Sequence, residues 1–236
     1  MGLIVLYGCG GLGLEVLSQF RSRLDAVHGE TLCIVDSGAA RVSDAERLLG
    51  HPVQVFESLE QLPDDASPGS EPDSPRGLFV MAVGDAARRR ELFAACVASG
   101  LVPLTLVHDS AIVDPASSIG SGCTIGPYAY VGPFSTVGEN CVLNTYASVG
   151  HDAWLGASSV LSPHATMSGR ARCGEAGFLG TGSVITASGS LGSFGKLSAN
   201  SVLTRSTSPG SLAHGNPATH RIMFNVPDTA TAQDKS

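Results

Sequence analysis

From residue 113 onward, an aliphatic or sulfur-containing side chain occupies every sixth position, and this period constrains the fold more than any other feature of the chain. All sixteen positions from Val113 to Leu203 obey the spacing. Glycine directly follows many of them, as at Gly126, Gly150 and Gly180. An α-helix cannot use a period of six, whereas a triangular coil of three short strands places one inward side chain on each side. The sequence therefore predicts a left-handed parallel β-helix of hexapeptide repeats, with roughly five turns of three hexapeptides each.

The first hundred residues follow a different pattern, in which short apolar strands alternate with helices. The apolar runs are residues 3–7, 31–35, 78–83 and 102–107. A glycine-rich segment, 8–13, follows the first run and leads into a helical pattern, and a second helix is expected at 86–98. Asp36 follows the second run, where a dinucleotide-binding fold places its ribose-binding acid. This alternation predicts an α/β domain, a small Rossmann-like parallel sheet with helices on its faces.

These two patterns divide the chain into three parts. We expect the Rossmann-like domain over residues 1–108, the β-helix domain over 109–222 and a C-terminal tail over 223–236. The proline-rich segment 67–75 predicts an exposed, mobile loop within the first domain.

Charge and cysteine content exclude several classes of protein. The net charge of −7 argues against attraction to nucleic acid or to an anionic membrane surface. The six cysteines lie far apart without a C-x-x-C pair, which predicts buried, reduced thiols. The N-terminus lacks the basic flank of a signal peptide, and no apolar run approaches the length of a membrane span. These features predict a cytoplasmic protein without a structural metal.

A few residues interrupt the regular repeat and mark the place where function is expected. Asn144 and the triplet Gly150-His151-Asp152 stand in a run of otherwise small residues, Trp154 is the only tryptophan, and His164 lies at a turn of the coil.

Asn144, Gly150-His151-Asp152, the surrounding hexapeptides and the closing segment 215–218 resemble the sialic-acid O-acetyltransferase and bacterial nucleotide-aminosugar N-acetyltransferase family. The resemblance covers nearly the whole chain. It implies a trimer, with acetyl-coenzyme A (acetyl-CoA) as co-substrate in the groove between neighbouring β-helices. It also implies that the N-terminal domain binds a nucleotide-linked sugar for surface glycan biosynthesis.

Acetyl transfer requires a base with a pKa near neutrality, because the acceptor loses a proton as it attacks the thioester. Histidine is the natural candidate. We assign this role to His151, matching the family's histidine, with a contribution of ~10²–10⁴ in rate. Asp152 is expected to hold the imidazole tautomer. Adjacent strand residues point to opposite faces, so only a corner of the coil lets these two side chains meet.

The resemblance also carries over the ligand-binding residues. Acceptor binding is assigned to Gly8, Gly10, Gly11, Asp36 and Gly84. Coenzyme binding is assigned to Val160, Gly180, Thr181, Gly182 and Ala199. Two positions depart from the family pattern: Val160 stands where many members have a second histidine, and Leu12 stands where they have one in the first loop. His164 either replaces the second histidine or only occupies a corner.

Four readings of the function remain. The first is an acetyl-CoA-dependent N-acetyltransferase acting on a nucleotide-linked amino-deoxy sugar, for example a 4-amino-4,6-dideoxyhexose. The second is an O-acetyltransferase acting on sialic acid or a related sugar. The third is a non-catalytic or zinc-dependent hexapeptide protein, although His151 and His164 are not spaced by the ~18 residues that adjacent coils require. The fourth is a nicotinamide-dependent enzyme, suggested by the glycine loop alone.

Overall fold

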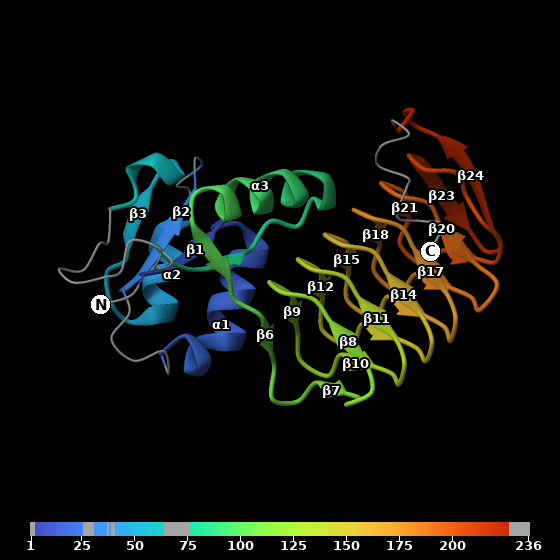
Figure 1. Cartoon of the computed structure of the whole chain (residues 1–236), viewed down its shortest axis with the longest axis horizontal. Coiled ribbons are helices and arrows are strands. Elements are labelled where there is room, and N and C mark those ends of the chain that lie inside the picture. Colours follow the sequence, from blue (N-terminus) through green and yellow to red (C-terminus); the bar gives the residue numbers. More distant parts are fainter. Residues whose placement is uncertain (1–2, 26–30, 37, 39–40, 64–75, 227–236) are drawn as a thin grey trace. The chain divides into compact units, whose positions relative to one another are not determined.

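The computed structural model describes residues 3–25, 31–36, 38, 41–63 and 76–226, which divide into two compact units. The first unit comprises Met1–Gly84 and Glu91–Leu106, and the second comprises Asp85–Arg90 and Val107–Ser236. The predicted architecture of a parallel sheet with helices followed by a β-helix is confirmed (Figure 1). The domain limits at residues 108 and 222 stay predictions. The segment 67–75 and the tail from residue 227 lie outside the described residues.

The first unit contains a five-stranded sheet with the order β3-β2-β1-β4-β5. Every pairing in it is parallel. Its strands are β1 (Leu3–Tyr7), β2 (Thr31–Val35), β3 (Gln54–Phe56), β4 (Gly77–Met81) and β5 (Leu101–Pro103). The chain moves outward in one direction from β1 to β3 and then returns to β4 on the other side of β1. The strand order therefore reverses between β1 and β4.

Helices cover both faces of this sheet. They are α1 (Gly11–Asp25), α2 (Val42–Leu49), the short 3-10 helix η1 (Leu59–Gln61) and α3 (Ala86–Ala98). Phe20 of α1 lies in one buried cluster with inward residues of β1, and Phe93 of α3 packs on Phe79 of β4 on the opposite face, with ring centroids 5.3 Å apart. The sheet is thus the middle of three layers, in agreement with its apolar strands.

Two parts of this unit differ from the sequence prediction. The helix α2 and strand β3 were not predicted, because α2 is only two turns long. The C-terminus of α2 is closed by Gly50 at φ 79° and by Arg21, whose guanidinium group donates hydrogen bonds to the carbonyl oxygens of Leu48 and Leu49. The predicted strand 102–107 is also wrong as a single element. β5 ends at Pro103, beyond which the Leu104 N–H still donates to Phe79 O at 2.8 Å, and β6 (Leu106–Val107) joins a sheet of the β-helix instead.

The second unit is a prism of three sheets whose strands are parallel except for the antiparallel pair of β23 and β24, and each sheet takes its name from one central strand. The strands of the β13 sheet are β7 (Ile112–Val113), β10 (Tyr130–Val131), β13 (Ser148–Val149), β16 (Thr166–Met167), β19 (Val184–Ile185) and β22 (Val202–Leu203). Those of the β14 sheet are β8 (Ser118–Ile119), β11 (Thr136–Val137), β14 (Trp154–Leu155), β17 (Arg172–Cys173) and β20 (Ser190–Leu191). Those of the β15 sheet are β6, β9 (Thr124–Ile125), β12 (Val142–Leu143), β15 (Val160–Leu161), β18 (Phe178–Leu179), β21 (Lys196–Leu197), β23 (Ser211–Gly215) and β24 (Ala218–Ile222).

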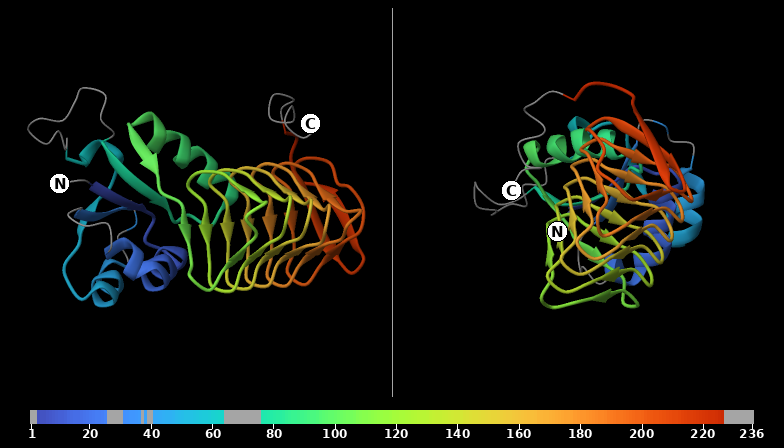
Figure 2. Two further views of the ribbon diagram at one scale, coloured as in Figure 1. Left: turned by 60° about the horizontal axis from the view of Figure 1, so that its bottom comes forward. Right: turned by 90° about the vertical axis from the view of Figure 1, so that its right-hand side faces the viewer.

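A regular register stacks the coils along the prism (Figure 2). From β7 to β22, paired strands are eighteen residues apart, as in Leu143 with Leu161 and Leu161 with Leu179. All three of these leucines are 0% exposed and belong to one continuous core. Because every sixth residue points inward, the predicted period is the physical repeat of the core.

The glycines after the inward residues are not the positions that adopt the left-handed backbone conformation. The left-handed backbone conformation occurs two residues later and is mostly held by other residue types, such as Tyr146 (φ 60°) and Asp152 (φ 57°). The glycines instead permit close approach between coils. An added Cβ at Gly156, for example, would lie 2.6 Å from the backbone nitrogen of Glu175 in the next coil.

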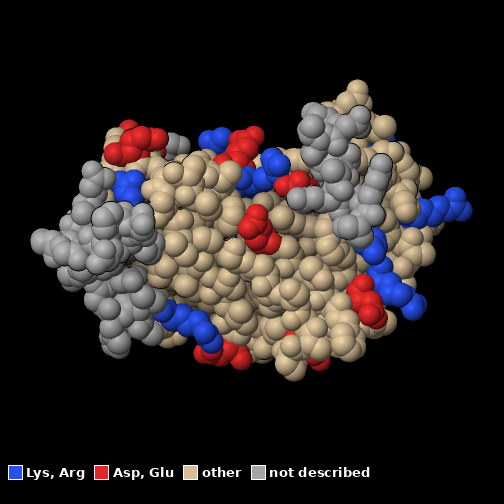
Figure 3. Space-filling model, in the orientation of Figure 1, with Lys and Arg blue, Asp and Glu red and all other residues tan. Residues whose placement is uncertain are grey.

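Residues 85–90, the short segment that belongs to the second unit, are fixed on the prism by polar contacts. Arg89 is 0% exposed, and its Nε donates to the backbone oxygen of Asn140 at 2.6 Å. Arg90 pairs with Glu175, and Lys196 pairs with Asp85 at 3.5 Å. Burial lowers the pKa of Arg89 to about 10. On the face shown in Figure 3, charged side chains of both signs are interspersed among wide uncharged areas.

Candidate functional site

The residues predicted to act as base and orienting acid meet at one corner of the prism. His151 and Asp152 lie in the turn that joins β13 to β14, and Asp152 adopts the left-handed conformation at φ 57°. This bend turns both side chains to the same side of the chain, so His151 Nδ1 lies 2.7 Å from Asp152 Oδ2. Both side chains remain accessible, with 56% of His151 and 52% of Asp152 exposed. The two side chains could meet only at a corner of the coil, and the structure has a corner at these residues.

The hydrogen bond to Asp152 fixes which imidazole nitrogen is available. A carboxylate accepts a hydrogen bond only from a nitrogen that carries a proton, so the neutral ring that makes this bond carries its proton on Nδ1. Nε2 then holds a lone pair and faces away from Asp152. This arrangement can accept a proton from an attacking nucleophile, which is the chemistry expected of the site.

Gly169 is a part of this site that the sequence analysis missed. It lies eighteen residues after His151, one coil further along the same corner, and the imidazole lies directly over it. An added Cβ at Gly169 would come within 2.2 Å of Nε2 and 2.6 Å of Cε1 of His151. Gly169 does not have a positive φ, so space for the ring, rather than backbone freedom, requires glycine here. The eighteen-residue register could have identified it.

Most of the predicted coenzyme residues lie at another corner of the same prism. Gly180, Thr181 and Gly182 form the turn between β18 and β19, and Ala199 lies in the equivalent turn of the next coil, between β21 and β22. This corner joins the β15 sheet to the β13 sheet, whereas His151 lies where the β13 sheet meets the β14 sheet. The structure of one chain therefore does not bring these residues together with His151.

Val160 differs from the other predicted coenzyme residues. Its side chain is only 3% exposed in β15, which leaves no surface for a coenzyme to contact. The burial counts against a role in coenzyme binding, and the assignment of Val160 stays a prediction.

His164 belongs to a stack of aromatic side chains at the corner of the coenzyme residues. Its ring lies 4.9 Å from that of Tyr146, which in turn lies 5.0 Å from the ring of Tyr128, and both interplanar angles are 11°. The three residues are eighteen positions apart in the sequence, so they occupy the same corner in three successive coils. His164 is thus at a different corner from His151.

The predicted acceptor residues gather at the carboxyl end of the sheet in the first unit. Gly8 (φ 101°) follows β1, and Gly10 and Gly11 open α1, with nothing within 4 Å of an added Cβ at either. Gly84 follows β4 and is equally open. Asp36 accepts hydrogen bonds from the backbone N–H of Cys9 at 2.5 Å and of Gly38 at 2.7 Å. The carboxylate therefore holds the glycine loop in place, a contact that the sequence did not predict.

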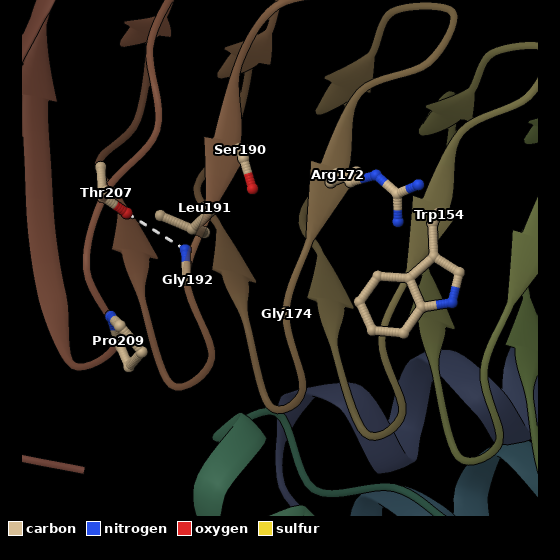
Figure 4. A pocket seen from close by; sticks show the side chains of 8 residues that line it. All are labelled: Trp154, Arg172, Gly174, Ser190, Leu191, Gly192, Thr207 and Pro209. Atoms are coloured by element: carbon tan, nitrogen blue, oxygen red, sulfur yellow. Dashed lines mark hydrogen bonds between the residues drawn. The ribbon is translucent and has the colours of Figure 1, made fainter. Parts of the chain in front are cut away.

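A shallow pocket of about 150 Å³ lies on the β14 sheet (Figure 4). Its walls come from strands β14, β17 and β20 and from the last coil; they include Trp154, Arg172, Ser190, Gly192, Thr207 and Pro209. The Gly192 N–H donates to the Thr207 hydroxyl oxygen at 3.1 Å and joins the last coil to β20. Trp154 stands only three residues after His151 in the chain.

Metal-binding clusters and membrane-spanning helices are both absent from the described residues. These residues contain no group of three or more His, Cys, Asp or Glu side chains placed to hold a metal ion. Within the same ranges, no helix has the length and apolar character needed to cross a membrane.

Comparison with known proteins finds similarity among solved structures. No protein-family model matches the sequence, and no curated protein matches it either. Among solved structures, PerB from Caulobacter crescentus, in complex with CoA and GDP-perosamine, is 28% identical with a TM-score of 0.78, over 94% of this chain and 98% of that one. A mutant of perosamine N-acetyltransferase from the same organism gives the same identity and TM-score, over 94% of this chain and 97% of its own.

A third similar structure is the acetyltransferase domain of PglB from Neisseria gonorrhoeae. It is 27% identical with a TM-score of 0.77, over 93% of this chain and 99% of that domain. The same domain has been solved in complex with acetyl coenzyme A. The resemblance predicted from the repeat and the Gly-His-Asp motif is thus confirmed, because the structural neighbours of the chain are sugar-modifying acetyltransferases with the same fold.

Proposed function

We propose that the chain is an acetyl-CoA-dependent N-acetyltransferase that modifies the amino group of a nucleotide-linked amino-deoxy sugar. The observation that carries the proposal is the pair formed by His151 and Asp152, 2.7 Å apart at an accessible corner of the prism. The similar structures solved with CoA, acetyl coenzyme A and GDP-perosamine support the same chemistry.

In the proposed reaction the sugar amine attacks the thioester carbonyl directly. The new C–N bond forms as the C–S bond breaks, the amine proton passes to Nε2 of His151, and the thiolate of the coenzyme leaves and is protonated. Asp152 stabilises the imidazolium that forms, through its hydrogen bond to Nδ1. Gly169 keeps the space beneath the ring free, so that Nε2 can face the amine. No covalent enzyme intermediate is needed.

The first unit supports a nucleotide-linked acceptor over a free sugar. Ligands of open parallel sheets bind beyond the carboxyl ends of the strands, where the strand order reverses. In this sheet that point lies between β1 and β4, next to Gly8 and Gly84. The first turn of α1 presents backbone N–H groups at Gly11, which suit a pyrophosphate. A free sialic acid would make no use of this edge.

We further propose that the working enzyme is a homotrimer whose sites form between copies. The coenzyme residues at 180–182 and the base His151 lie at different corners of one prism, so a single ligand reaches both only if the corners belong to neighbouring chains. Exposed apolar side chains lie on the face between these corners, where Ile112 is 66% and Tyr130 39% exposed, and at the coenzyme corner itself, where Tyr146 is 49% exposed. Exposed apolar surface of this kind marks an interface.

Acetyl transfer tests the activity directly. Release of free coenzyme thiol is followed with acetyl-CoA against a panel of nucleotide-linked amino sugars, with free sialic acid as the oxygen acceptor. We expect turnover with an amino sugar and a fall of ~10²–10⁴-fold in kcat for His151→Ala. His220→Ala, an exposed histidine of β24, is the matched control. Activity with sialic acid alone would assign the enzyme to O-acetylation, and an undiminished His151 variant would remove the proposed base.

Subunit mixing tests the shared site. His151→Ala removes the base, and Thr181→Trp fills the corner assigned to the coenzyme, so each homotrimer should be inactive. When the two variants are unfolded together and refolded, mixed trimers regain some sites that carry both intact corners. Light scattering should give three times the 24.1 kDa of one chain. A monomeric mass, or no recovery of activity in mixtures of stable trimers, would contradict the shared site.

A further inference from the structure

We propose that Phe134 is a specificity-determining residue of the acceptor site, and that its ring contacts the methyl group of a 6-deoxy amino sugar. The proposal rests on the proposed acetyltransferase function. It gives a role to the most exposed large apolar side chain among the described residues, which is 70% accessible. This side chain belongs to neither the catalytic pair, the glycine loop nor the coenzyme corner.

Phe134 lies at the same corner of the prism as the catalytic pair, one coil earlier. It belongs to the turn that joins β10 to β11, and Asp152, eighteen residues later, occupies the equivalent position in the turn that joins β13 to β14. The two turns are in direct contact, because the Asp152 N–H donates to the backbone oxygen of Pro133 at 3.1 Å. Phe134 is therefore the neighbour of Asp152 on the side of the earlier coils.

The backbone directs the ring of Phe134 the same way as the carboxylate of Asp152. Both residues adopt the left-handed conformation with φ 57°, and the strands on either side of the two turns pair in parallel register. The Cα–Cβ bonds of the two residues are therefore nearly parallel. The ring leaves the corner on the side where Asp152 meets His151.

Phe134 differs from the other aromatic residues that adopt the left-handed conformation. This conformation is unfavourable for a bulky side chain, and elsewhere in the prism a ring contact accompanies it. Tyr146 stacks between Tyr128 and His164, and Phe194 has a guanidinium group 5.7 Å from its ring centroid. Within the described part of the chain, Phe134 has no such contact. Its ring is available to a ligand.

The neighbours of Phe134 at this corner leave its ring uncovered. One coil earlier, the equivalent position holds Ala116, which is itself exposed and has only a methyl group as its side chain. One coil later, the carboxylate of Asp152 accepts its hydrogen bond from His151. An exposed aromatic ring between two short side chains gains free energy when a ligand places an apolar group against it.

The position along the prism favours the acceptor over the coenzyme as this ligand. The residues assigned to the coenzyme, 180–182 and Ala199, belong to later coils than His151, whereas Phe134 belongs to an earlier one. The imidazole lies over Gly169. Because neighbouring coils are about 4.8 Å apart, the imidazole is roughly 5–10 Å along the prism from Phe134. A hexose that presents its amine to Nε2 extends across this interval.

The methyl group of a 6-deoxy sugar is the group that a phenyl ring at this place recognises. In a 4-amino-4,6-dideoxyhexose, the ring carbon that carries the amine is bonded to the one that carries the methyl group. An amine at Nε2 therefore brings the methyl group to the same corner. A hydroxymethyl group would lose water there and gain no hydrogen bond from the ring. Such a contact changes kcat/KM by about 10-fold or more.

Acceptor preference tests this role of Phe134. Thiol release is measured with UDP- and GDP-linked 4-amino-4,6-dideoxyglucose, and with analogues that carry a hydroxymethyl group in place of the methyl group. We expect kcat/KM of the unmodified enzyme to favour the 6-deoxy acceptor by roughly 10-fold or more. Phe134→Ala should reduce this preference to about twofold or less by raising KM for the 6-deoxy acceptor, with kcat and KM for acetyl-CoA unchanged.

Two matched variants and a mass measurement accompany Phe134→Ala. Phe134→Leu keeps an apolar side chain and should keep most of the preference. Phe224→Ala removes another exposed phenylalanine, which follows β24, and should leave every kinetic constant unchanged. Light scattering compares the assembly of Phe134→Ala with that of the unmodified protein. Dissociation of the variant into monomers would assign the ring to the contact between subunits and overturn the proposal.

Saturation-transfer NMR detects the contact without any acetyl transfer. Selective irradiation of the aromatic protons of the full-length protein should saturate the C6 methyl protons of a bound 6-deoxy sugar nucleotide. Phe134→Ala should remove most of this methyl signal while saturation of the ribose protons persists, because the nucleotide still binds. Loss of both signals to the same extent would contradict a contact specific to the methyl group.

Failure of this proposal is distinguishable from failure of the proposed function. An active enzyme whose Phe134→Ala variant keeps the preference for the 6-deoxy acceptor would overturn the assignment of Phe134 alone. A variant in which only KM for acetyl-CoA rises would place the ring against the coenzyme and overturn it as well. A methyl signal that depends on Phe134 in a protein that transfers no acetyl group would support the contact and count against the function. Absence of both the signal and the transfer would count against both proposals.

Discussion

Substituting alanine for Gly169 tests whether the position of the imidazole, rather than its mere presence, determines the rate. The new Cβ would lie 2.2 Å from Nε2 of His151. Carbon and nitrogen atoms in contact are separated by about 3.5 Å, so the ring must move by roughly 1.3 Å. The imidazole is the end of an accessible side chain and can rotate away, so the strain falls on the geometry of the site and not on the coil.

A displacement of about 1 Å at a reacting group can reduce the rate ~10²-fold. We therefore expect kcat of Gly169→Ala to fall about 10²-fold, with little change in KM for acetyl-CoA and a loss of stability of ~1 kcal/mol or less. Steady-state thiol release gives the kinetic constants, and thermal unfolding gives the stability. In the His151→Ala background the same substitution should have no further effect on kcat, because the two residues act as one unit.

Gly126→Ala is the matched control for this experiment. Its Cβ would meet backbone atoms of the next coil, the nearest being Leu143 O at 3.1 Å, and it lies at a different corner of the prism from His151, one coil earlier. The control should lose some stability and keep its kcat. An unchanged kcat for Gly169→Ala would refute the reasoning, as would equal losses of kcat in both glycine variants.

Three further predictions concern the acid, the core and the thiols. Asp152→Asn should lower kcat by roughly 10–100-fold, because the imidazolium of His151 loses its partner, although water at this half-exposed site screens part of the effect; a kcat within twofold of the unmodified enzyme would contradict the pairing. Leu161→Ala should reduce the free energy of unfolding by about 3 kcal/mol, since it removes a side chain that is 0% exposed, and chemical denaturation measures the loss. Burial raises the pKa of Cys33 and of Cys96 to about 12, so these two thiols should react with a colorimetric disulfide reagent only after unfolding, and rapid reaction of either in the folded protein would contradict their burial.

The repeat made the second unit almost fully predictable. A six-residue period determines which side chains point inward, and a triangular coil then determines that residues eighteen apart are neighbours. Leu143, Leu161 and Leu179 accordingly form consecutive layers of the core. The first unit was less predictable. Its helix α2 and strand β3 are short, and their formation depends on tertiary contacts such as the hydrogen bonds from Arg21 to the end of α2.

Part of the candidate site could also be predicted from the sequence. The adjacency of His151 and Asp152 required only a corner, which the repeat supplies, and Gly169 follows from the register. The contact from Asp36 to the glycine loop was not predictable in the same way. This contact depends on a turn in which the carboxylate accepts hydrogen bonds from two backbone N–H groups at once. The spacing of about twenty residues between the glycines and Asp36 does not specify that turn.

The corners of the prism explain why a list of residues does not by itself describe a site. The resemblance assigned Thr181 and His151 to the same site. The register of the coils puts them at different corners of the prism, so the body of the prism separates them. The same register puts Trp154 and Arg172 side by side on the sheet that begins at His151. If a coenzyme bridges two chains, its reactive end must meet one chain's base while its pantetheine arm follows the neighbour's corner.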